Sequence, residues 1–296
     1  MTLRTKAEWL LFGTTFIWGS TFVVVKAGSG FVSPSLFIAL RFGLGAIIFA
    51  LLLRSEILTI RKSTLVKGSI LGLMLGSGIV IQNYGIYETT ASKAAFITGL
   101  MVIFTPIAQM LIEKKSPKAG NVIGIVVVIV GLYLLTSPTG SGINIGDLLV
   151  LTSAMIFGVY IVYLDIFTKM ENVLHLAFIQ VTMTTITAGL SIPFEKVVFS
   201  PVTQLIVSIV YMGICATVIT TYIQTRYQKD TTPTRAVIIF TFEPVIAAVL
   251  AYYVLNELLG VIAVIGASLI IVGILISEFS DTISEKFFST KFTRNK

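Results

Sequence analysis

The most deeply placed acidic residue of this sequence is Glu243, and a carboxyl group in such surroundings can do chemistry. Glu243 lies midway along the apolar stretch Ala236–Leu255, in the run FTFEPV, with no charged neighbour in the sequence. An ionisable group inside a long apolar stretch is costly and needs an explanation. The carboxyl group can bind a substrate amine or carry a proton, or it can pair with a cation of another helix. The sequence leaves both the functional and the structural interpretation open.

Two prolines interrupt apolar stretches at matching places in the two halves of the chain. Pro244 lies in the stretch that holds Glu243, and Pro106 lies inside another stretch. Proline donates no backbone hydrogen bond and crowds the carbonyl group four residues earlier, which belongs to Phe240 and to Val102. Interrupted helices in both halves of a chain indicate a transport site, and a packing kink is the alternative. We count Phe240 among the candidate substrate-binding residues.

One face of the first apolar stretch combines two aromatic rings with a cation. Trp18, Phe22 and Lys26 follow one another at intervals of four residues, which places them on one side of a helix. Aromatic rings near a cation suit an organic substrate, through stacking or through pairing with a carboxylate. The alternative is that the rings pack against other helices and that Lys26 extends its ammonium group to the outer interface.

Other polar residues lie deep in further apolar stretches. Arg41 lies eight residues into the second stretch, and Gln180 lies at the matching depth of the seventh. A guanidinium group at that depth can hold a substrate carboxylate or tie helices together, and we expect Arg41 and Gln180 to be structural. Gln82 and Tyr222 are our candidates for lining a cavity. The alternative is that they form hydrogen bonds between helices.

The chain contains ten apolar stretches of 17–22 residues each, and these residues lie on or next to seven of them. Of the 296 residues, 55% are hydrophobic and 12% are charged, whereas a soluble domain carries about 25% charged residues. Each stretch is long enough for a helix that crosses a bilayer and too long for a barrel strand. The sequence therefore predicts an all-α integral membrane protein with ten transmembrane helices. The stretches are Ala7–Val25, Pro34–Leu53, Lys67–Tyr87, Ala94–Ile112, Ala119–Leu135, Gly146–Leu164, Leu174–Pro193, Val202–Ile223, Ala236–Leu255 and Leu258–Ile276.

The composition excludes several classes of protein and of site. Cys215 is the one cysteine and His175 the one histidine, so an internal disulfide is excluded and a His/Cys metal site or a Ser/His/Asp triad is disfavoured. Gly140-Ser141-Gly142 follows no strand and lacks the lysine of a phosphate-binding loop. We therefore expect a protein that is not an enzyme and that has no catalytic residue, metal, cofactor or nucleic acid partner.

The lysines and arginines predict how the helices are oriented. With a cytoplasmic N-terminus, seventeen of the 21 lie in cytoplasmic segments, and only Lys93 and Lys196 lie in outside loops. Cytoplasmic loops of membrane proteins carry an excess of these residues, so we expect both termini in the cytoplasm and the protein in the cytoplasmic membrane. The seventeen are Arg4, Lys6, Arg54, Arg61, Lys62, Lys67, Lys114, Lys115, Lys118, Lys169, Arg226, Lys229, Arg235, Lys286, Lys291, Arg294 and Lys296.

The two halves of the chain match each other in four places, in the same order. Because each half holds five helices, an odd number, the second must enter the membrane from the opposite side, as in the inverted repeats of secondary transporters. We expect one repeat at 1–137, a second at 138–278 and a basic tail at 279–296, which either lies on anionic lipid or is disordered. The matches are EWLLFGTTFIWGSTFVVVK (8–26) with DLLVLTSAMIFGVYIVYLD (147–165), TTASKAA (89–95) with TTPTRAV (231–237), Pro106 with Pro244, and GIVVVIVGLYLL (124–135) with GASLIIVGILI (266–276).

Five features of the chain resemble the EamA-type permeases of the drug/metabolite transporter superfamily. They are the run WGSTFVVVK, Arg41, the runs TTASKAAFITGL and TTPTRAVIIFTFEPV, and the glycines seven residues apart in the fifth and tenth stretches. The resemblance covers residues 5–278 and implies a permease for amino acids, metabolites or drugs, many such permeases being exporters. One departure is Asn256-Glu257, which stands where the family often has a Gly-Glu pair.

We expect a secondary transporter that moves an amino acid or a related metabolite outward by alternating access. The aromatic residues together with Lys26 and Glu243 favour this substrate. One alternative is efflux of cationic drugs, which needs Glu243 but not Lys26; another is a membrane scaffold or lipid-handling protein without transport. The expected partners are the lipid bilayer, the solute and a proton or counter-substrate. Glycines recur at helical spacing at 68, 72 and 76, at 124 and 131, and at 266 and 273. They can pack helices together inside one bundle or between two copies, so we expect a monomer or a homodimer.

Overall fold

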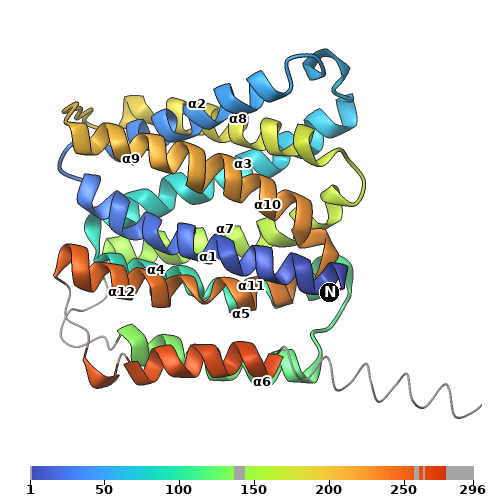
Figure 1. Ribbon diagram of the computed structural model, residues 1–296, viewed down its shortest axis with the longest axis vertical. Helices are drawn as coiled ribbons and strands as arrows, with labels where there is room; N and C mark the ends of the chain where they lie inside the picture. Colours follow the sequence, from blue (N-terminus) through green and yellow to red (C-terminus); the bar gives the residue numbers. More distant parts are fainter. Residues whose placement is uncertain (1, 137–143, 257–259, 263, 278–296) are drawn as a thin grey trace, which may run out of the picture.

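The computed structural model describes residues 2–136, 144–256, 260–262 and 264–277, and these residues form a bundle of helices (Figure 1). No β-strand forms among them, and one isolated bridge pairs Val32 with Phe199. The α-helices are α1 (Leu3–Gly28), α2 (Pro34–Leu52), α3 (Lys62–Glu88), α4 (Ala91–Gly99), α5 (Met101–Glu113), α6 (Ala119–Thr136), α7 (Ile145–Thr168), α8 (Val173–Ser191), α9 (Thr203–Gly213), α10 (Thr220–Tyr227), α11 (Pro233–Phe240), α12 (Glu243–Leu255) and a further helix, Val264–Ser277. Shorter segments are η1 (Ile57–Thr59), η2 (Ile192–Phe194), η3 (Ile214–Ile219) and η4 (Gln228–Asp230).

Eight of the ten predicted stretches form helical segments that are long and apolar enough to cross a membrane. The fifth and tenth stretches correspond to the shorter apolar helices Ala119–Leu135 and Val264–Ser277. Large apolar side chains such as Leu51, Val126 and Val207 point outward and are more than half exposed, which suits a surface covered by lipid rather than by water. The chain is therefore an all-helical, multi-pass membrane protein.

The fourth and ninth stretches are each broken into two helices. The break in the ninth lies at Thr241-Phe242, and Pro244 follows it in the first turn of α12, where a missing backbone N–H costs nothing. The break in the fourth lies at Leu100, six residues before Pro106, and α5 continues through that proline. The prediction from Pro106 therefore put the break of the fourth stretch too far along the chain.

A glycine accounts for the position of the earlier break. Gly99 ends α4, and a Cβ atom there would lie 3.2 Å from Cγ of Pro244 and 3.1 Å from a methyl group of Leu132. The absence of a side chain thus allows the two interrupted helices to meet at their breaks. Pro106 lies in the second turn of α5, where its ring is buried.

The eighth stretch contains a π-helical segment, η3, between α9 and α10. In a π-helix each turn holds an extra residue, so backbone carbonyl groups lose their usual partners. The carbonyl oxygen of Ala216, in this segment, accepts a hydrogen bond from Nη2 of Arg41 at 2.8 Å.

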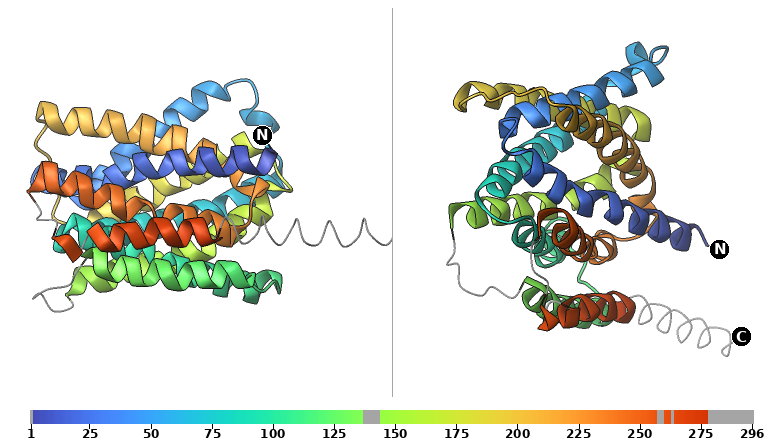
Figure 2. Two further views of the ribbon diagram at one scale, coloured as in Figure 1. Left: turned by 60° about the horizontal axis from the view of Figure 1, so that its bottom comes forward. Right: turned by 60° about the vertical axis from the view of Figure 1, so that its left-hand side comes forward.

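Glycines set the closest helix contacts in the bundle. Cβ atoms on Gly124 and Gly131 of α6 would lie 2.8 Å from the carbonyl oxygens of Gly273 and Gly266, so α6 and the helix Val264–Ser277 lie side by side (Figure 2). Three glycines of α3 approach α8 equally closely. They are Gly68, Gly72 and Gly76. Among the described residues, these glycines therefore serve as packing positions within the bundle.

Candidate functional site

A cavity of about 110 Å³ lies in the middle of the bundle, between both halves of the chain. The two broken helices meet beside it, since α4 packs against α12 and α5 against α11. The lining side chains come from both halves of the sequence. They are Trp18, Thr21, Phe22, Arg41, Phe42, Leu75, Ile79, Gln82, Thr98, Met101, Phe157, Tyr160, Ile161, Ala216, Thr221, Gln224, Phe240 and Glu243.

Aromatic rings form one wall of the cavity. Trp18 and Phe240 meet edge to face, with ring centroids 5.2 Å apart and planes at 76°, a favourable geometry for two aromatic rings. The indole N–H of Trp18 donates to the hydroxyl oxygen of Thr220 at 3.0 Å, which fixes the orientation of the ring. Phe22 lines the cavity from the next turn of α1. The predicted aromatic face of α1 therefore points inward.

Lys26 does not line this cavity, although the sequence placed it on the same helix face. Its ammonium group donates to the carbonyl oxygens of Ile86 and Tyr87, at 3.2 and 3.0 Å. These carbonyl groups lie in the last turn of α3, where they lack intrahelical partners and where a cation is favourable. Lys26 thus caps α3, a role that neither sequence interpretation foresaw.

Glu243 lines the cavity from the first turn of α12 and is only 6% exposed. In the part of the chain that the structure describes, its carboxyl group has no hydrogen-bond or ion-pair partner. The N-terminal turn of a helix favours a negative charge, so the start of α12 gives this group partial compensation. A cationic group of a solute in the cavity would compensate the remaining negative charge.

Arg41 brings a permanent cation to the same cavity. Its Nε donates to the hydroxyl oxygen of Thr217 at 2.9 Å, and its Nη2 donates to the carbonyl oxygen of Ala216. These bonds tie α2 to the π-helical segment. Nη1 has no partner among the residues that the structure describes, so Arg41 can also donate to a carboxylate in the cavity.

Of the remaining candidates, Gln82 lines the cavity and donates from Nε2 to the hydroxyl oxygen of Thr98 at 2.9 Å. Tyr222 does not line the cavity and is 40% exposed on the outside of the bundle. Its neighbours Thr221 and Gln224 face inward instead. Depth in the eighth stretch suggested Tyr222 but did not specify which side of the helix faces inward.

Gln180 lies behind the cavity wall and is completely buried. The hydroxyl group of Tyr160 donates to Oε1 of Gln180, and Nε2 of Gln180 donates to the hydroxyl oxygen of Thr225, both at 2.8 Å. Gln180 therefore orients Tyr160, which lines the cavity. No signal in the sequence distinguished Tyr160 from the other apolar and aromatic residues of α7.

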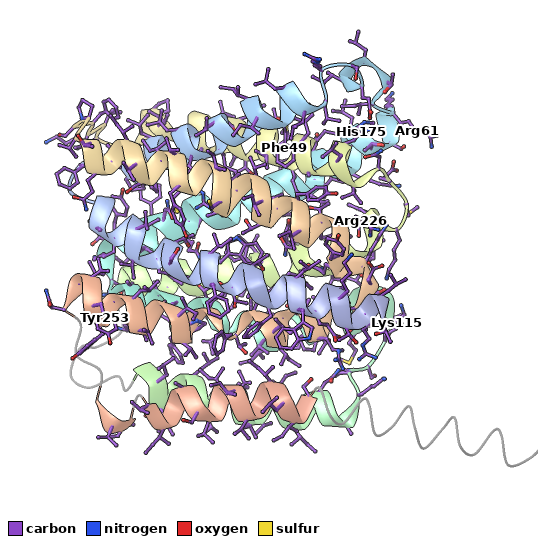
Figure 3. The ribbon with its side chains drawn as sticks, viewed as in Figure 1. Phe49, Arg61, Lys115, His175, Arg226 and Tyr253 are labelled. Atoms are coloured by element: carbon purple, nitrogen blue, oxygen red, sulfur yellow. The ribbon has the colours of Figure 1, made fainter. Side chains whose placement is uncertain are left out.

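Basic residues gather at one end of the bundle. Arg61, Lys115 and Arg226 lie at the end that holds the N-terminus, and Tyr253 lies at the opposite end (Figure 3). His175 also lies at the basic end, with Nε2 at 3.2 Å from a carboxylate oxygen of Glu56. Within the described residues, no group of three His, Cys, Asp or Glu side chains could hold a metal ion. The predicted tail at 279–296 and Glu257 lie outside the described residues.

Asn256, which stands where the family often has glycine, forms a turn of the kind that glycine favours. It takes a left-handed backbone conformation, with φ of 55°, at the end of α12. Glycine favours this conformation, and asparagine tolerates it better than most residues. Lys114 has the same conformation, with φ of 59°, at the end of α5, so both broken helices end in the same kind of turn.

Comparisons with known proteins agree with this architecture. The model of the EamA-like transporter family matches residues 5–137 and 144–279. An uncharacterized transporter of Archaeoglobus fulgidus is 31% identical over 260 residues, which are 88% of this chain and 82% of that protein. The uncharacterized transporter YoaV of Bacillus subtilis is 25% identical, over 91% of this chain and 96% of its own. A protein of known crystal structure has the same fold, with a TM-score of 0.76 at 21% identity, over 93% of this chain and 96% of that one.

Proposed function

Since the chain belongs to the EamA-like transporter family, we propose that this membrane transporter is a secondary permease that moves a small organic solute across the cytoplasmic membrane by alternating access. The observation that carries the proposal is the cavity at the breaks of two helices. It is lined by an aromatic wall, by the guanidinium group of Arg41 and by the carboxyl group of Glu243, which has no partner among the described residues. Transporters bind their solutes at such sites, between two repeats and near the bilayer midplane.

The proposed architecture is ten transmembrane helices in two inverted repeats of five, with α6 and the helix Val264–Ser277 as the fifth and tenth spans. The repeats are 1–137 and 138–278, followed by the tail at 279–296. The family model supports this division because it matches the chain twice. In the proposed repeat, α1 corresponds to α7 and α5 corresponds to α12. The packing supports the division as well, because α5 packs against α7 just as α12 packs against α1.

The proposed substrate is an amino acid or a related zwitterionic metabolite. Glu243 would bind the ammonium group, and Arg41, rather than Lys26, would bind the carboxylate through its remaining N–H groups. Trp18 and Phe240 would contact the apolar part of the solute. A cationic drug would use Glu243 and the aromatic wall but not Arg41, so the two substrate classes differ in their dependence on Arg41.

We propose export as the direction, with a proton or a counter-substrate as the coupled species and both termini in the cytoplasm. The resemblance to permeases that are often exporters supports the direction. The excess of basic residues at the end that holds the N-terminus supports the orientation. Glu243 is the proposed proton carrier if protons are coupled, because it is the cavity acid.

Flux measurements in proteoliposomes test this proposal. Labelled amino acids and labelled organic cations are offered with and without a pH gradient, to the wild type and to Arg41→Gln. We expect saturable amino-acid flux that falls at least about tenfold in Arg41→Gln, the effect of losing a charge-assisted hydrogen bond. Saturable flux of cations alone, unaffected by Arg41→Gln, would assign the chain to drug efflux. No saturable flux of any solute would favour a scaffold or lipid-handling protein.

A further inference from the structure

Each half of the chain contains an acid, a threonine and a basic residue at positions that correspond between the halves. An acid lies near the start of the first helix of each half, Glu8 in the second turn of α1 and Asp147 in the first turn of α7. A threonine and, four residues later, a cation open the broken helix of each half, as TTASKAA and TTPTRAV show. In the folded chain, the acid of each half contacts the threonine and the cation of the other half.

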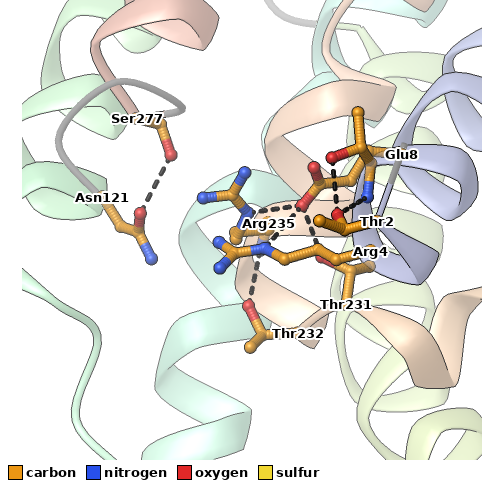
Figure 4. Close-up of polar contacts among 9 residues, drawn as sticks. Thr2, Arg4, Glu8, Asn121, Thr231, Thr232, Arg235 and Ser277 are labelled. Carbon is orange, nitrogen blue, oxygen red and sulfur yellow. Dashed lines mark hydrogen bonds and ion pairs between the residues drawn. The ribbon is translucent and has the colours of Figure 1, made fainter. Parts of the chain in front are cut away.

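Glu8 forms the first of these clusters (Figure 4). Nε of Arg235 lies 2.8 Å from Oε1 of Glu8, and the hydroxyl group of Thr231 donates to the same oxygen at 3.0 Å. Nε of Arg4 lies 3.1 Å from it. Arg235 is 2% exposed and Glu8 is 7% exposed, so this cluster joins α1 to α11 in a buried environment at the basic end of the bundle.

Asp147 forms the second cluster. Nζ of Lys93 lies 2.6 Å from Oδ2 of Asp147, and the hydroxyl group of Thr89 donates to Oδ1 at 2.9 Å. The backbone N–H of Asn144 donates to Oδ2 at 2.9 Å. This cluster joins α7 to α4 at the opposite end of the bundle. The N-terminus and the start of α1 lie at the basic end, and Lys26 near the end of α1 contacts the last turn of α3, after which α4 begins.

Both clusters act on helices that reach the central cavity. Thr98 of α4 and Phe240 of α11 line it, as do Phe157 of α7 and Trp18 of α1. Separating α1 from α11 would open the cavity towards the basic end, and separating α7 from α4 would open it towards the other end. Either movement must expose to water an ion pair whose acid is buried, and the separated charges then need hydration.

We propose that the Glu8–Arg235 and Asp147–Lys93 clusters are two ionic latches, one at each mouth of the transport path, and that transport breaks them in alternation. This inference rests on the proposed alternating-access function. Each latch stabilises the closed form of its own mouth, so loss of one shifts the population towards the form that is open at that end. The inverted repeat supplies the same device twice, once for each side of the membrane.

Side-specific labelling tests the latches without a substrate. Cys215, the one cysteine of the chain, is replaced by serine, and Thr21, which lines the cavity, is replaced by cysteine. A membrane-impermeant maleimide is then added to sealed vesicles of either orientation. We expect Glu8→Gln to raise labelling from the face that bears the N-terminus at least about fivefold, and Asp147→Asn to raise it equally from the other face.

Matched variants separate a latch from a general loss of stability. Arg235→Lys and Lys93→Arg keep the charge and should keep the wild-type labelling pattern. Lys169→Gln removes an ion pair of similar length, 2.6 Å to Asp165, that lies within one helix and its cap, and it should favour neither face. Thr231→Val and Thr89→Val remove one hydrogen bond from each cluster and should give smaller shifts in the same two directions, even if the charge variants fail to fold.

Equal labelling from both faces in Glu8→Gln and Asp147→Asn, or unchanged labelling in folded threonine variants, would overturn the latches. Opposite shifts in the two halves would support them. Because labelling requires no solute, this outcome is independent of the flux assay. A chain with saturable flux and no side-specific shift would remain a permease without these latches, and a chain with the shifts but no flux would overturn the permease.

Discussion

Glu243 is the residue on which the proposed chemistry depends. We expect Glu243→Gln to fold normally, because the amide keeps the shape of the carboxyl group and no partner among the described residues loses a bond. The amide cannot pair with a substrate ammonium group or carry a proton, so flux should fall about 10- to 100-fold, the effect of losing a charge-assisted hydrogen bond. Flux and thermal stability are measured together, with Glu56→Gln as the control because that acid does not line the cavity. Wild-type flux at every pH would make Glu243 structural.

Glu195 gives a prediction about acid stability. It lies after η2, outside the helices that could span the membrane, and accepts hydrogen bonds from the hydroxyl groups of Ser33 and Tyr84 and from the backbone N–H groups of Ser35 and Leu36. Burial acts to raise the pKa of Glu195, but these bonds outweigh it and lower the pKa below its ordinary value of 4.5. The ionised form therefore stabilises the fold above about pH 4.5, and this stabilisation is lost as the pH falls through the lower pKa of the folded state.

Thermal unfolding between pH 3 and 7, in about half-unit steps, tests this linkage. We expect Glu195→Gln to be less stable than the wild type near neutral pH and the difference to shrink as the pH falls. Tyr84→Phe removes one of the donors and should lose part of the same pH-dependent stability. A constant difference between Glu195→Gln and the wild type at all pH values would contradict the role of the charge.

At the residue scale, the sequence located the cavity residues on α1 and α12 but not the cation. Regular helical spacing predicted that Trp18 and Phe22 share a face, and depth predicted that Glu243 needs an explanation. Lys26 shares that face by spacing, but its long side chain reaches the end of α3 instead. The roles of Arg41 and Tyr160 depend on contacts between distant segments, which no local pattern specifies.

The packing of α1 gives a prediction at the scale of elements. A Cβ atom on Gly19 would lie 2.7 Å from Cβ of Ile246 and 2.8 Å from the carbonyl oxygen of Glu243, whereas one on Gly13 would meet nothing within 4 Å. Both glycines lie in α1. We expect Gly19→Ala to destabilise the fold by about 1–3 kcal/mol through overpacking, and Gly13→Ala to be neutral or stabilising by up to about 1 kcal/mol, because alanine favours a helix. Unfolding of both purified variants measures the difference, and equal stability would contradict the close approach of α1 to α12.

Element boundaries show where local patterns fail. The hydrophobic stretches predicted the long helices because their length reflects the thickness of a bilayer. The break before α5 follows from the contact of Gly99 with Pro244, which lies in another part of the chain, so Pro106 alone gave the wrong position. The π-helical segment Ile214–Ile219 has no marker in its sequence, and depth along the eighth stretch did not show that Gln224 rather than Tyr222 lines the cavity.

At the scale of the whole molecule, the proposed inverted repeat accounts for several pairs of features together. The breaks at Leu100 and Thr241-Phe242, the left-handed turns at Lys114 and Asn256, and the two ion-pair clusters each occur once in either half. The cavity between the halves is not symmetric, because Glu243 corresponds to Met101 in the alignment of TTPTRAV with TTASKAA. The features shared by the two proposed repeats would therefore support the alternating-access movement. Residues present in one half alone, such as Glu243, would determine which solute binds.

Orientation in the membrane gives the last prediction. In the proposed orientation, the end with Arg61, Lys115 and Arg226 faces the cytoplasm, because cytoplasmic segments carry an excess of lysine and arginine. Gly30 follows α1 and therefore lies at the other end, where it is exposed and has open space around it. Ser55 follows α2, is exposed and lies at the basic end. In the Cys215→Ser background, Gly30→Cys should react with an impermeant maleimide only from outside the cell, and Ser55→Cys only after the membrane is opened. Reaction of Gly30→Cys solely from the cytoplasmic side would reverse the topology and would place the Glu8–Arg235 cluster at the outer mouth, while the packing of the helices would stand.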